Sequence, residues 1–316
     1  MTTAVSPVSP PLSFAVMGAG AVGSYFGALL ARAGHAVTLI GRPAHVQAIA
    51  DQGGLQVESA AFTGTVPLRA DTAPSAVAGA DVVLFSVKST DTEAAAAQIA
   101  PHLRPGALVL TLQNGVDNDA RVRDVLGAAH TVAAAVVYVA TSLPAPGRVR
   151  HHGRGELVIG PPSAAAQKAA RQLGAAGIPS EVVPDVRGAL WAKLVVNCAY
   201  NALSALTRLS YGPLAQGHAA VPAVLDGIVD ECLAVARADG VQVPGDVRAN
   251  VRAIAGTMAG QHSSTAQDLA RGRPTEIDHL NGYVVRRGEA LGVPVPVNRL
   301  LWVAVKLVEG APASRG

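Results

Sequence analysis

The stretch that most constrains the fold is FAVMGAGAVGSYFGALLARAGHAVTLIGR, residues 14–42. It begins with an apolar run typical of a strand, passes through a glycine-rich turn into a helical pattern, and returns to the β-branched run AVTLI. This order predicts a β-α-β unit with its glycines at the strand-to-helix turn, which is the arrangement that binds a dinucleotide. The turn residues expected to contact the cofactor are Gly18, Ala19, Gly20, Ala21, Val22 and Gly23.

Each glycine of this turn has its own expected role. Gly18 permits the tight turn, Gly20 lets a pyrophosphate approach the backbone, and Gly23 allows the helix to pack closely. The N-terminus of the helix then faces the phosphates, where its dipole favours negative charge. An ordinary glycine-containing turn would show the same spacing, but the order strand, turn, helix and strand favours dinucleotide binding.

The end of the second strand indicates which dinucleotide is bound. NAD-binding proteins place an acid there, which bonds the ribose 2′-hydroxyl. This chain has Ile40-Gly41-Arg42 at that point and no carboxylate until Asp51. Because a guanidinium pairs well with a 2′-phosphate, Arg42 favours NADPH/NADP+ as the cofactor, the alternative being a solvated loop arginine.

Two later strands also end in polar residues. In open α/β sheets, ligands bind beyond the carboxyl ends of the strands. The runs ADVVLFSVKSTDT and GALVLTLQNGVDN therefore supply further site candidates, of which Lys88 and Asn114 are assigned to the cofactor. The full set of strand-end candidates is Ser86, Lys88, Gln113 and Asn114.

Length and composition limit the classes of protein that remain. A chain of 316 residues exceeds the usual size of one domain, and 50% hydrophobic residues suffice for a sizeable core. The net charge of +3 is spread along the chain without a basic run, which argues against a nucleic-acid partner. Cys198 and Cys232 form no disulfide framework or metal-ligand spacing, so we expect no metal and a cytoplasmic setting.

The domain organisation follows from changes in pattern along the chain. Residues 1–12 lack the features of a signal peptide and are expected to be a mobile tail. Residues 13–185 are expected to form an NADP-binding Rossmann domain, extended by antiparallel strands in its last part. Residues 186–316 show long helical periods and predict an all-helical substrate and catalytic domain. The apolar stretches are too short to span a membrane, so a soluble protein is expected.

Two adjacent histidines in the first domain have to be considered as a metal pair. His151 and His152 are adjacent in a predicted strand, where neighbouring side chains face opposite sides. No third ligand is evident, so we expect surface or edge residues instead.

A polar column marks the first helix of the second domain. ALWAKLVVNCAYNALSAL, residues 189–206, is mostly apolar, yet Lys193, Asn197 and Asn201 recur at every fourth position and would lie along one face. A lysine among apolar residues is paired, shifts its pKa, or snorkels to solvent. The position of the helix just after the domain boundary predicts that the column lines the cleft between the domains.

A second polar segment, SSTAQDLARGRPTEIDHLNG, spans residues 263–282 and is expected to face the same cleft. Thr275 is a candidate helix cap, with Glu276 and Asp278 in the first turn against the helix dipole. This structural role suits Asp278. Glu276 would serve both as a first-turn acid and as a site residue if its side chain faces the cleft.

The motifs together resemble the ketopantoate reductase (2-dehydropantoate 2-reductase) family over nearly the whole chain after the tail. The segments that carry the resemblance, in the order of the family, are GAGAVGSYFG, SVKSTDT, LQNGVDN, WAKLVVNCAYNALSAL and SSTAQDLARGRPTEIDHLNG. The resemblance implies a Rossmann domain that binds NADPH and a helical domain that closes over a small 2-oxo acid substrate. It also allows a homodimer, although the sequence shows no interface pattern.

The resemblance implies roles for individual residues. Lys193 would be the general acid that protonates the alkoxide formed by hydride transfer. Glu276 would bind the hydroxyl region of the substrate and tune Lys193. The residues implied to hold the substrate are Asn114, Asn197, Asn201 and Ser264, with Asn114 also meeting the nicotinamide.

Two positions depart from the family pattern, and alternative functions remain open. Ala202 follows Asn201 where the family often has proline, and Thr265 stands where methionine is common. The alternatives are a reductase of another 2-oxo acid, a β-hydroxyacid dehydrogenase relative, and a non-catalytic NADPH-binding regulatory protein. The SSTAQD and TEID segments argue against the second, and the intact polar set argues against the third.

Overall fold

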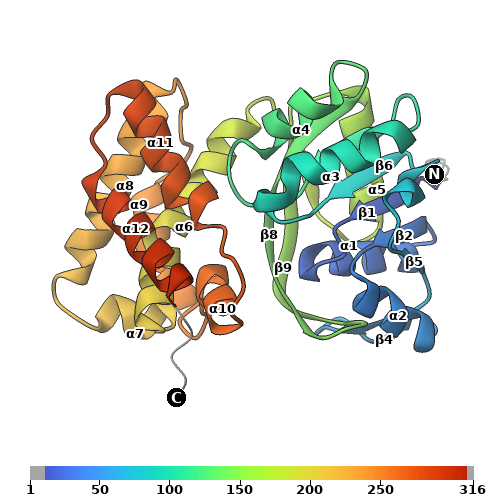
Figure 1. Ribbon diagram of the computed structural model, residues 1–316, viewed down its shortest axis with the longest axis horizontal. Coiled ribbons are helices and arrows are strands. Elements are labelled where there is room, and N and C mark those ends of the chain that lie inside the picture. Colours follow the sequence, from blue (N-terminus) through green and yellow to red (C-terminus); the bar gives the residue numbers. More distant parts are fainter. Residues whose placement is uncertain (1–10, 312–316) are drawn as a thin grey trace, which may run out of the picture. The chain divides into compact units, whose positions relative to one another are not determined.

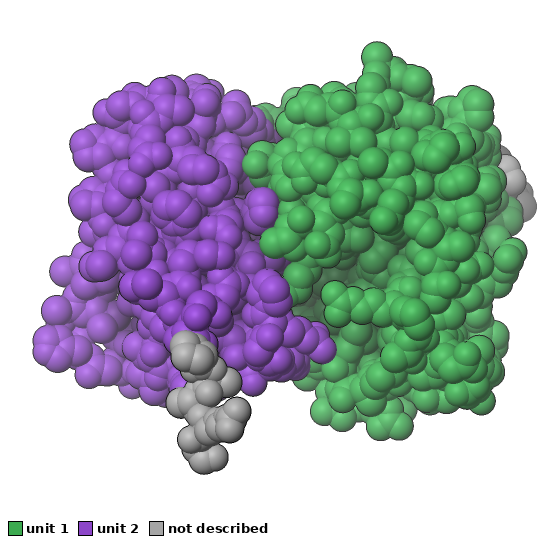
Figure 2. Space-filling model, in the orientation of Figure 1, with its two compact units in different colours: residues 1–113, 117–186 green, residues 114–116, 187–316 purple. Residues whose placement is uncertain are grey.

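The computed structural model describes residues 11–311 and divides into two compact units, coloured green and purple in Figure 2. The first unit contains residues up to 113 and residues 117–186. The second contains residues 114–116 and everything from 187 onward. The tail prediction for residues 1–12 falls mostly outside the described residues; Leu12, which is described, is buried in the core of the first unit.

The first unit is built on one mixed sheet, which has ten strands among the described residues (Figure 1). The strand order is β4-β3-β9-β8-β7-β6-β1-β2-β5, and β10 pairs with β9. The run from β8 to β5 is parallel throughout, whereas β8 pairs antiparallel with β9 and β3 with β4. The strands are β1 (Ser13–Met17), β2 (Ala36–Ile40), β3 (Leu55–Glu58), β4 (Thr63–Val66), β5 (Arg69–Asp71), β6 (Val82–Phe85), β7 (Leu108–Thr111), β8 (Thr131–Ala145), β9 (Arg148–Gly160) and β10 (Ser180–Val182).

Helices cover both faces of this sheet, because the parallel strands are apolar on both sides. In β1, Phe14 and Val16 join the core under α1 and α5, whereas Ala15 and Met17 join the core under α3 and α4. The helices of this unit are α1 (Ala21–Arg32), α2 (Pro43–Asp51), α3 (Thr92–Ile99), α4 (Asn118–Leu126) and α5 (Ala164–Ala175), with short 3₁₀ turns η1 (Pro74–Val77), η2 (Ser89–Asp91) and η3 (Ala100–His102).

The second unit is helical over its described residues. Its elements are α6 (Val186–Thr207), α7 (Tyr211–Gln216), α8 (Val221–Ala238), α9 (Val247–Thr257), α10 (Ser264–Ala270), η4 (Ile277–His279), α11 (Asn281–Leu291) and α12 (Pro296–Gly310). Asp239, which follows α8, has a nearly buried carboxylate that accepts hydrogen bonds from Arg187 at the start of α6 and Arg287 in α11. The predicted fold class, a Rossmann-type α/β domain followed by an all-helical one, is confirmed.

The long β8–β9 hairpin corresponds to the predicted antiparallel strands, and the adjacent histidines His151 and His152 lie on its second strand. β9 pairs with β3 at residues 148–150 and with β10 at residues 157–159, so His151 and His152 lie between these stretches, on a part of β9 that pairs with β8 alone. This agrees with the prediction of surface or edge residues. The ring of His151 stacks on Tyr25 of α1, with the centroids 4.3 Å apart, and the exposed His152 shares a 2.8 Å hydrogen bond with Ser142. The part of the chain that the structure describes contains no group of side chains suited to a metal ion, and none of its helices is long and apolar enough to cross a membrane.

Candidate active site

The glycine-rich turn joins β1 to α1, and its shape depends on glycine at Gly18. The φ angle there is +97°, and a Cβ atom would lie 2.6 Å from the backbone nitrogen of Val87. At Gly20, by contrast, the position of a Cβ atom is open, with only Gly18 O at 4.0 Å. The turn is therefore closed against the sheet at Gly18 and open at Gly20, where the sequence predicts that a pyrophosphate approaches.

Main-chain hydrogen bonds hold this turn to two neighbouring strands. The backbone nitrogens of Gly18 and Ala19 donate to Ile40 O of β2, at 3.0 and 2.8 Å. From beyond the end of β6, Ser86 Oγ donates to Gly18 O at 2.8 Å. The helix that follows has Gly20 as its N-cap and no side-chain cap. Its first-turn N–H groups therefore suit an anion, and the residues present fit the phosphates of a dinucleotide.

Arg42 lies where β2 ends, beside the turn. Close packing of Gly41 on Ala19 brings this strand end to the turn, since a Cβ atom at Gly41 would lie 2.9 Å from that of Ala19. Arg42 is exposed and serves as the N-cap position of α2. The structure therefore places the predicted cofactor residue Arg42 at the strand end that packs on the glycine-rich turn.

Sequence reasoning missed a carboxylate at the same edge. Asp71 ends β5 and pairs in register with Ile40 of β2, and its backbone oxygen accepts from Gly41 N at 3.0 Å. Its carboxylate accepts a hydrogen bond from Ala73 N at 2.9 Å. The strand that carries it is only three residues long, so periodicity could not have placed it beside β2.

The loops that follow β6 and β7 rest on a buried polar network. Gln113 Nε2 donates to Thr92 Oγ1 at 2.8 Å, Thr92 Oγ1 bonds Asn118 Oδ1 at 3.0 Å, and Asn118 Nδ2 donates to Ser89 Oγ at 3.2 Å. All four side chains are buried. Lys88 immediately precedes Ser89, and Asn114 follows Gln113. The network therefore fixes the two loops that carry the predicted site residues Lys88 and Asn114.

In the helical unit, the predicted polar column lies along α6. Lys193 and Asn197 are partly buried, and Asn201 is only 3% exposed. Asn201 Nδ2 donates to Ser264 Oγ at 3.5 Å, so the structure brings together two of the residues that the sequence assigns to the substrate.

This junction depends on Ser263, which sequence reasoning did not single out. Ser263 Oγ caps α10 by accepting from Ala266 N at 3.0 Å, and it donates to Asn201 O at 3.1 Å. The cap leaves the neighbouring Ser264 side chain exposed. A serine pair just before a short helical pattern signals a cap at one of the two serines, but it does not say which one.

The segment with Glu276 differs in detail from the prediction. Thr275 does not cap an α-helix: its hydroxyl accepts a 3.3 Å hydrogen bond from Ile277 N, and α11 begins only at Asn281. Glu276 is partly buried and precedes the 3₁₀ turn η4. The structural interpretation of Asp278 is supported, since its carboxylate accepts from Trp302 Nε1 at 2.7 Å and Lys306 Nζ at 2.9 Å. Burial raises the pKa of Asp278, but these hydrogen bonds and the charge of Lys306 outweigh burial and bring the pKa below its ordinary value.

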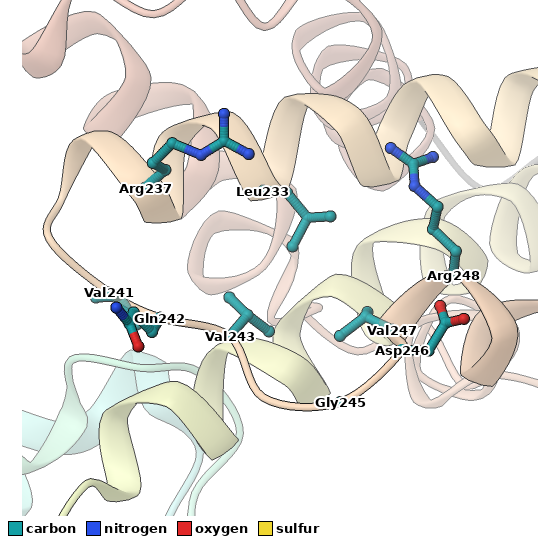
Figure 3. Close-up of a pocket in the computed structure, with 9 residues that line it drawn as sticks. All are labelled: Leu233, Arg237, Val241, Gln242, Val243, Gly245, Asp246, Val247 and Arg248. Atoms are coloured by element: carbon teal, nitrogen blue, oxygen red, sulfur yellow. The ribbon is translucent and has the colours of Figure 1, made fainter.

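A surface hollow of about 860 Å³ lies elsewhere in the helical unit, between the end of α8 and the start of α9 (Figure 3). None of the predicted site residues lines it. Among its lining residues, Asp246 caps α9 and Arg248 pairs with Asp226 and Asp230 of α8. These side chains join two helices, so the hollow is a feature of packing and is not assigned to the site.

Comparisons with known proteins agree with this geometry. Residues 14–164 match the family model for "Ketopantoate reductase PanE/ApbA", and residues 185–309 match the model for its C-terminal part. A curated 2-dehydropantoate 2-reductase of Halobacterium salinarum is 36% identical, with 93% of this chain and 98% of the relative covered. One from Vibrio cholerae is 32% identical, with 94% and 98% covered.

Solved structures are similar as well. A PanE/ApbA family ketopantoate reductase from Ralstonia eutropha JMP134 superimposes with a TM-score of 0.91 at 57% identity, covering 94% of this chain and 98% of that one. A D-mandelate dehydrogenase with NADH and anilino(oxo)acetate superimposes with a TM-score of 0.87 at 27% identity, covering 94% and 98%.

Proposed function

Since this chain belongs to the ketopantoate reductase family, we propose that it reduces 2-dehydropantoate (ketopantoate) to pantoate with NADPH. The observation that carries the proposal is the polar column of α6 joined at Asn201 to Ser264, in a chain whose other unit has a glycine-rich dinucleotide turn. An orienting set of amide and hydroxyl groups with one lysine is what carbonyl reduction requires of a protein.

We propose that residues 13–185 bind the cofactor. The turn from Gly18 to Gly23 would hold the pyrophosphate against the start of α1, Arg42 would pair with the 2′-phosphate, and Lys88 and Asn114 would complete the contacts. When bound, the nicotinamide supplies the hydride.

We propose that residues 186–316 supply the acid and the substrate contacts. Lys193 would donate a proton to the substrate oxygen as negative charge develops there, and its own charge would stabilise that oxygen more than the neutral ketone. Glu276 would bind the substrate hydroxyl region and tune Lys193. The side chains that would hold the substrate are Asn114, Asn197, Asn201 and Ser264.

The test is oxidation of NADPH by the purified protein, followed by absorbance, with ketopantoate as substrate. Pyruvate, 2-oxoisovalerate and a replacement of NADPH by NADH are the comparisons. Turnover restricted to ketopantoate and NADPH is the expected result. Absence of turnover with ketopantoate, together with measured NADPH binding, would contradict the proposed substrate.

A second candidate is reduction of a bulkier 2-oxo acid. The similarity to a D-mandelate dehydrogenase that was solved with NADH and anilino(oxo)acetate favours it, as does Thr265 in place of the methionine common in the family. Phenylglyoxylate in the same assay distinguishes the two, because a higher kcat/KM than that for ketopantoate would select this candidate.

We further propose a cytoplasmic homodimer. α12 exposes Leu300 at 69%, Val303 at 44%, Leu307 at 70% and Val308 at 48%, on a helix whose opposite face is buried. Exposed apolar stripes of this kind commonly mark protein interfaces. The test is light scattering on the protein and on Leu300→Asp with Leu307→Asp; a monomer in both would contradict the dimer.

A further inference from the structure

A chain of buried amides connects four helices of the second unit and ends on the backbone of α6. Asn281 Nδ2 donates to Cys198 O, in the middle of α6, at 3.2 Å, and to Asn298 Oδ1 of α12 at 2.9 Å. Asn298 Nδ2 in turn donates to Glu231 Oε2 of α8 at 2.8 Å. Asn281 and Asn298 are both 0% exposed, so the two hydrogen bonds of Asn281 are shielded from water, whereas the bond to Glu231 is partly buried.

The orientation of each amide is set by the one before it. The Glu231 carboxylate accepts hydrogen bonds from the backbone nitrogens of Val297 and Asn298, at 2.8 and 2.9 Å, and therefore faces the start of α12 as an acceptor. An acceptor there requires the NH₂ group of Asn298, which turns Asn298 Oδ1 toward Asn281. Asn281 must then present its own NH₂ group to both Asn298 Oδ1 and Cys198 O.

Asn281 is not the side chain that packing alone would favour. Its Oδ1 atom is buried and has no hydrogen-bond partner among the described residues. A buried acceptor without a partner opposes folding, whereas an apolar residue at this place would leave no such group. The two bonds from its NH₂ group are therefore what this residue contributes.

The same residue ends the segment that carries Glu276. Between them η4 forms a tight turn, in which His279 N donates to Glu276 O at 2.8 Å and Leu280 N to Ile277 O at 3.2 Å. On the other side of Glu276, the backbone nitrogen of Thr275 donates to Glu309 of α12. Glu276 thus lies in a short segment anchored at both ends, and Asn281 is the anchor to the helix of Lys193 and Asn197.

We propose that Asn281 is a positioning residue, which sets the register of the Glu276 segment against the catalytic face of α6. This inference rests on the proposed function, in which Lys193 is the acid and Glu276 tunes it. Loss of the bond to Cys198 O would let the segment shift relative to α6. A displacement of that kind weakens proton donation without removing any group that touches the substrate.

The decisive variants are Asn281→Asp, which keeps the size of the side chain but replaces its donor by an acceptor, and Asn281→Ala. Each should lower kcat for ketopantoate by about tenfold or more and shift the alkaline limb of the pH profile of kcat, with NADPH affinity unchanged. The matched control is Val284→Ala, in the same helix and fully buried but without a bond to α6. It should lower the melting temperature while leaving kcat and its pH profile as in the unmodified protein.

Equal kcat and pH profiles in the Asn281 variants and Val284→Ala, at similar losses of melting temperature, would overturn the proposal. If the Asn281 variants do not fold, Glu231→Gln takes their place, since it weakens the first link of the chain; a smaller kcat decrease with the same pH shift supports the proposal, and unchanged values overturn it.

Hydrogen exchange separates this inference from the proposed function. If the unmodified protein shows no turnover with any 2-oxo acid, the proposed function fails. The role of Asn281 in holding residues 275–281 against α6 can still be tested, because amide exchange does not depend on activity. Faster amide exchange in residues 275–281 in Asn281→Asp than in Val284→Ala supports it. Equal exchange in the two variants overturns it.

Discussion

The glycine-rich turn and the polar column of α6 are built in different ways. Two main-chain nitrogens and one hydroxyl hold the turn, and its essential residue, Gly18, has no side chain. The column consists of side chains on a regular helix, and other side chains from α10 and α11 hold that helix in place. Under the proposed function, the first region would select its ligand by the shape of the backbone, and the second by the identity of three side chains.

This difference predicts how each region responds to substitution. A change in the column should remove one chemical function and leave the fold intact. A change in the turn should alter either the fold or ligand affinity, depending on where the added atoms point. The expected effects follow from largest to smallest.

Lys193→Ala tests the column and should have the largest effect. If Lys193 is the general acid, kcat should fall by about a hundredfold or more, while the dissociation constant of NADPH stays the same. Steady-state kinetics and a fluorescence titration of NADPH measure the two quantities. A large loss of NADPH affinity would instead assign Lys193 to cofactor binding. It would contradict the division of roles between the turn and the column of α6.

Gly18→Ala and Gly20→Ala test the turn as a matched pair. Gly18→Ala adds a methyl group against the backbone of Val87 at a φ of +97°, so it should destabilise the fold and lower the melting temperature. Gly20→Ala adds the same group in open space and should leave the melting temperature nearly unchanged. Its NADPH affinity should nevertheless fall roughly tenfold, about 1.4 kcal/mol, because the methyl group occupies the approach of the pyrophosphate. Unchanged affinity in Gly20→Ala would remove this turn from the cofactor site.

The same difference explains what could be read from the sequence. The β-α-β unit was predictable because its glycines lie at fixed spacing between two local patterns, and the helical second unit was predictable from its long periods. The column was predictable because every fourth residue of a helix shares a face. All of these are relations within about thirty residues of chain.

Relations between distant segments could not be read in this way. Asp71 beside β2, the Gln113–Thr92–Asn118 network, and the bond from Asn281 to Cys198 each join residues that no local period connects. Ser263 was overlooked for a different reason: two adjacent serines qualify as caps, and only the geometry of α10 shows which one accepts the bond from Ala266 N.

Arg42→Ala tests an exception to this difference between the two regions. Arg42 is a side chain that is proposed to select the cofactor, but it lies beside a turn that is held mainly by main-chain hydrogen bonds. KM for NADPH should rise about fivefold, near 1 kcal/mol for an exposed ion pair, and KM for NADH should not change. Kinetics with both cofactors measure the ratio. An unchanged preference for NADPH over NADH would show that Arg42 does not distinguish the two cofactors at this strand end, where Asp71 also lies.

A substitution at His45 should have the smallest effect of those considered. It tests whether the region of the glycine-rich turn depends on buried side-chain hydrogen bonds. Its Nδ1 accepts from Gly147 N at 3.0 Å, so Nε2 carries the proton and donates to Ser24 Oγ of α1 at 3.1 Å. This arrangement requires a neutral ring, and burial lowers the pKa of His45 below its ordinary value of 6.5. The contribution to stability is therefore present above pH 6.5 and is lost as the pH falls from there toward the folded-state pKa.

The melting temperature of the unmodified protein should accordingly decrease between pH 7.5 and pH 5.5, and His45→Gln should show less of that decrease. The difference should be at most about 1 kcal/mol, or roughly 2–4 °C. Part of the decrease should remain in the variant, because burial also lowers the pKa of His35. His152→Gln, at an exposed position on β9, is the control and should keep the full decrease. If His45→Gln and His152→Gln have the same pH dependence of the melting temperature, the hydrogen bond from His45 of α2 to Ser24 of α1 does not contribute to stability. Main-chain hydrogen bonds and Ser86 would then account for the stability of the turn.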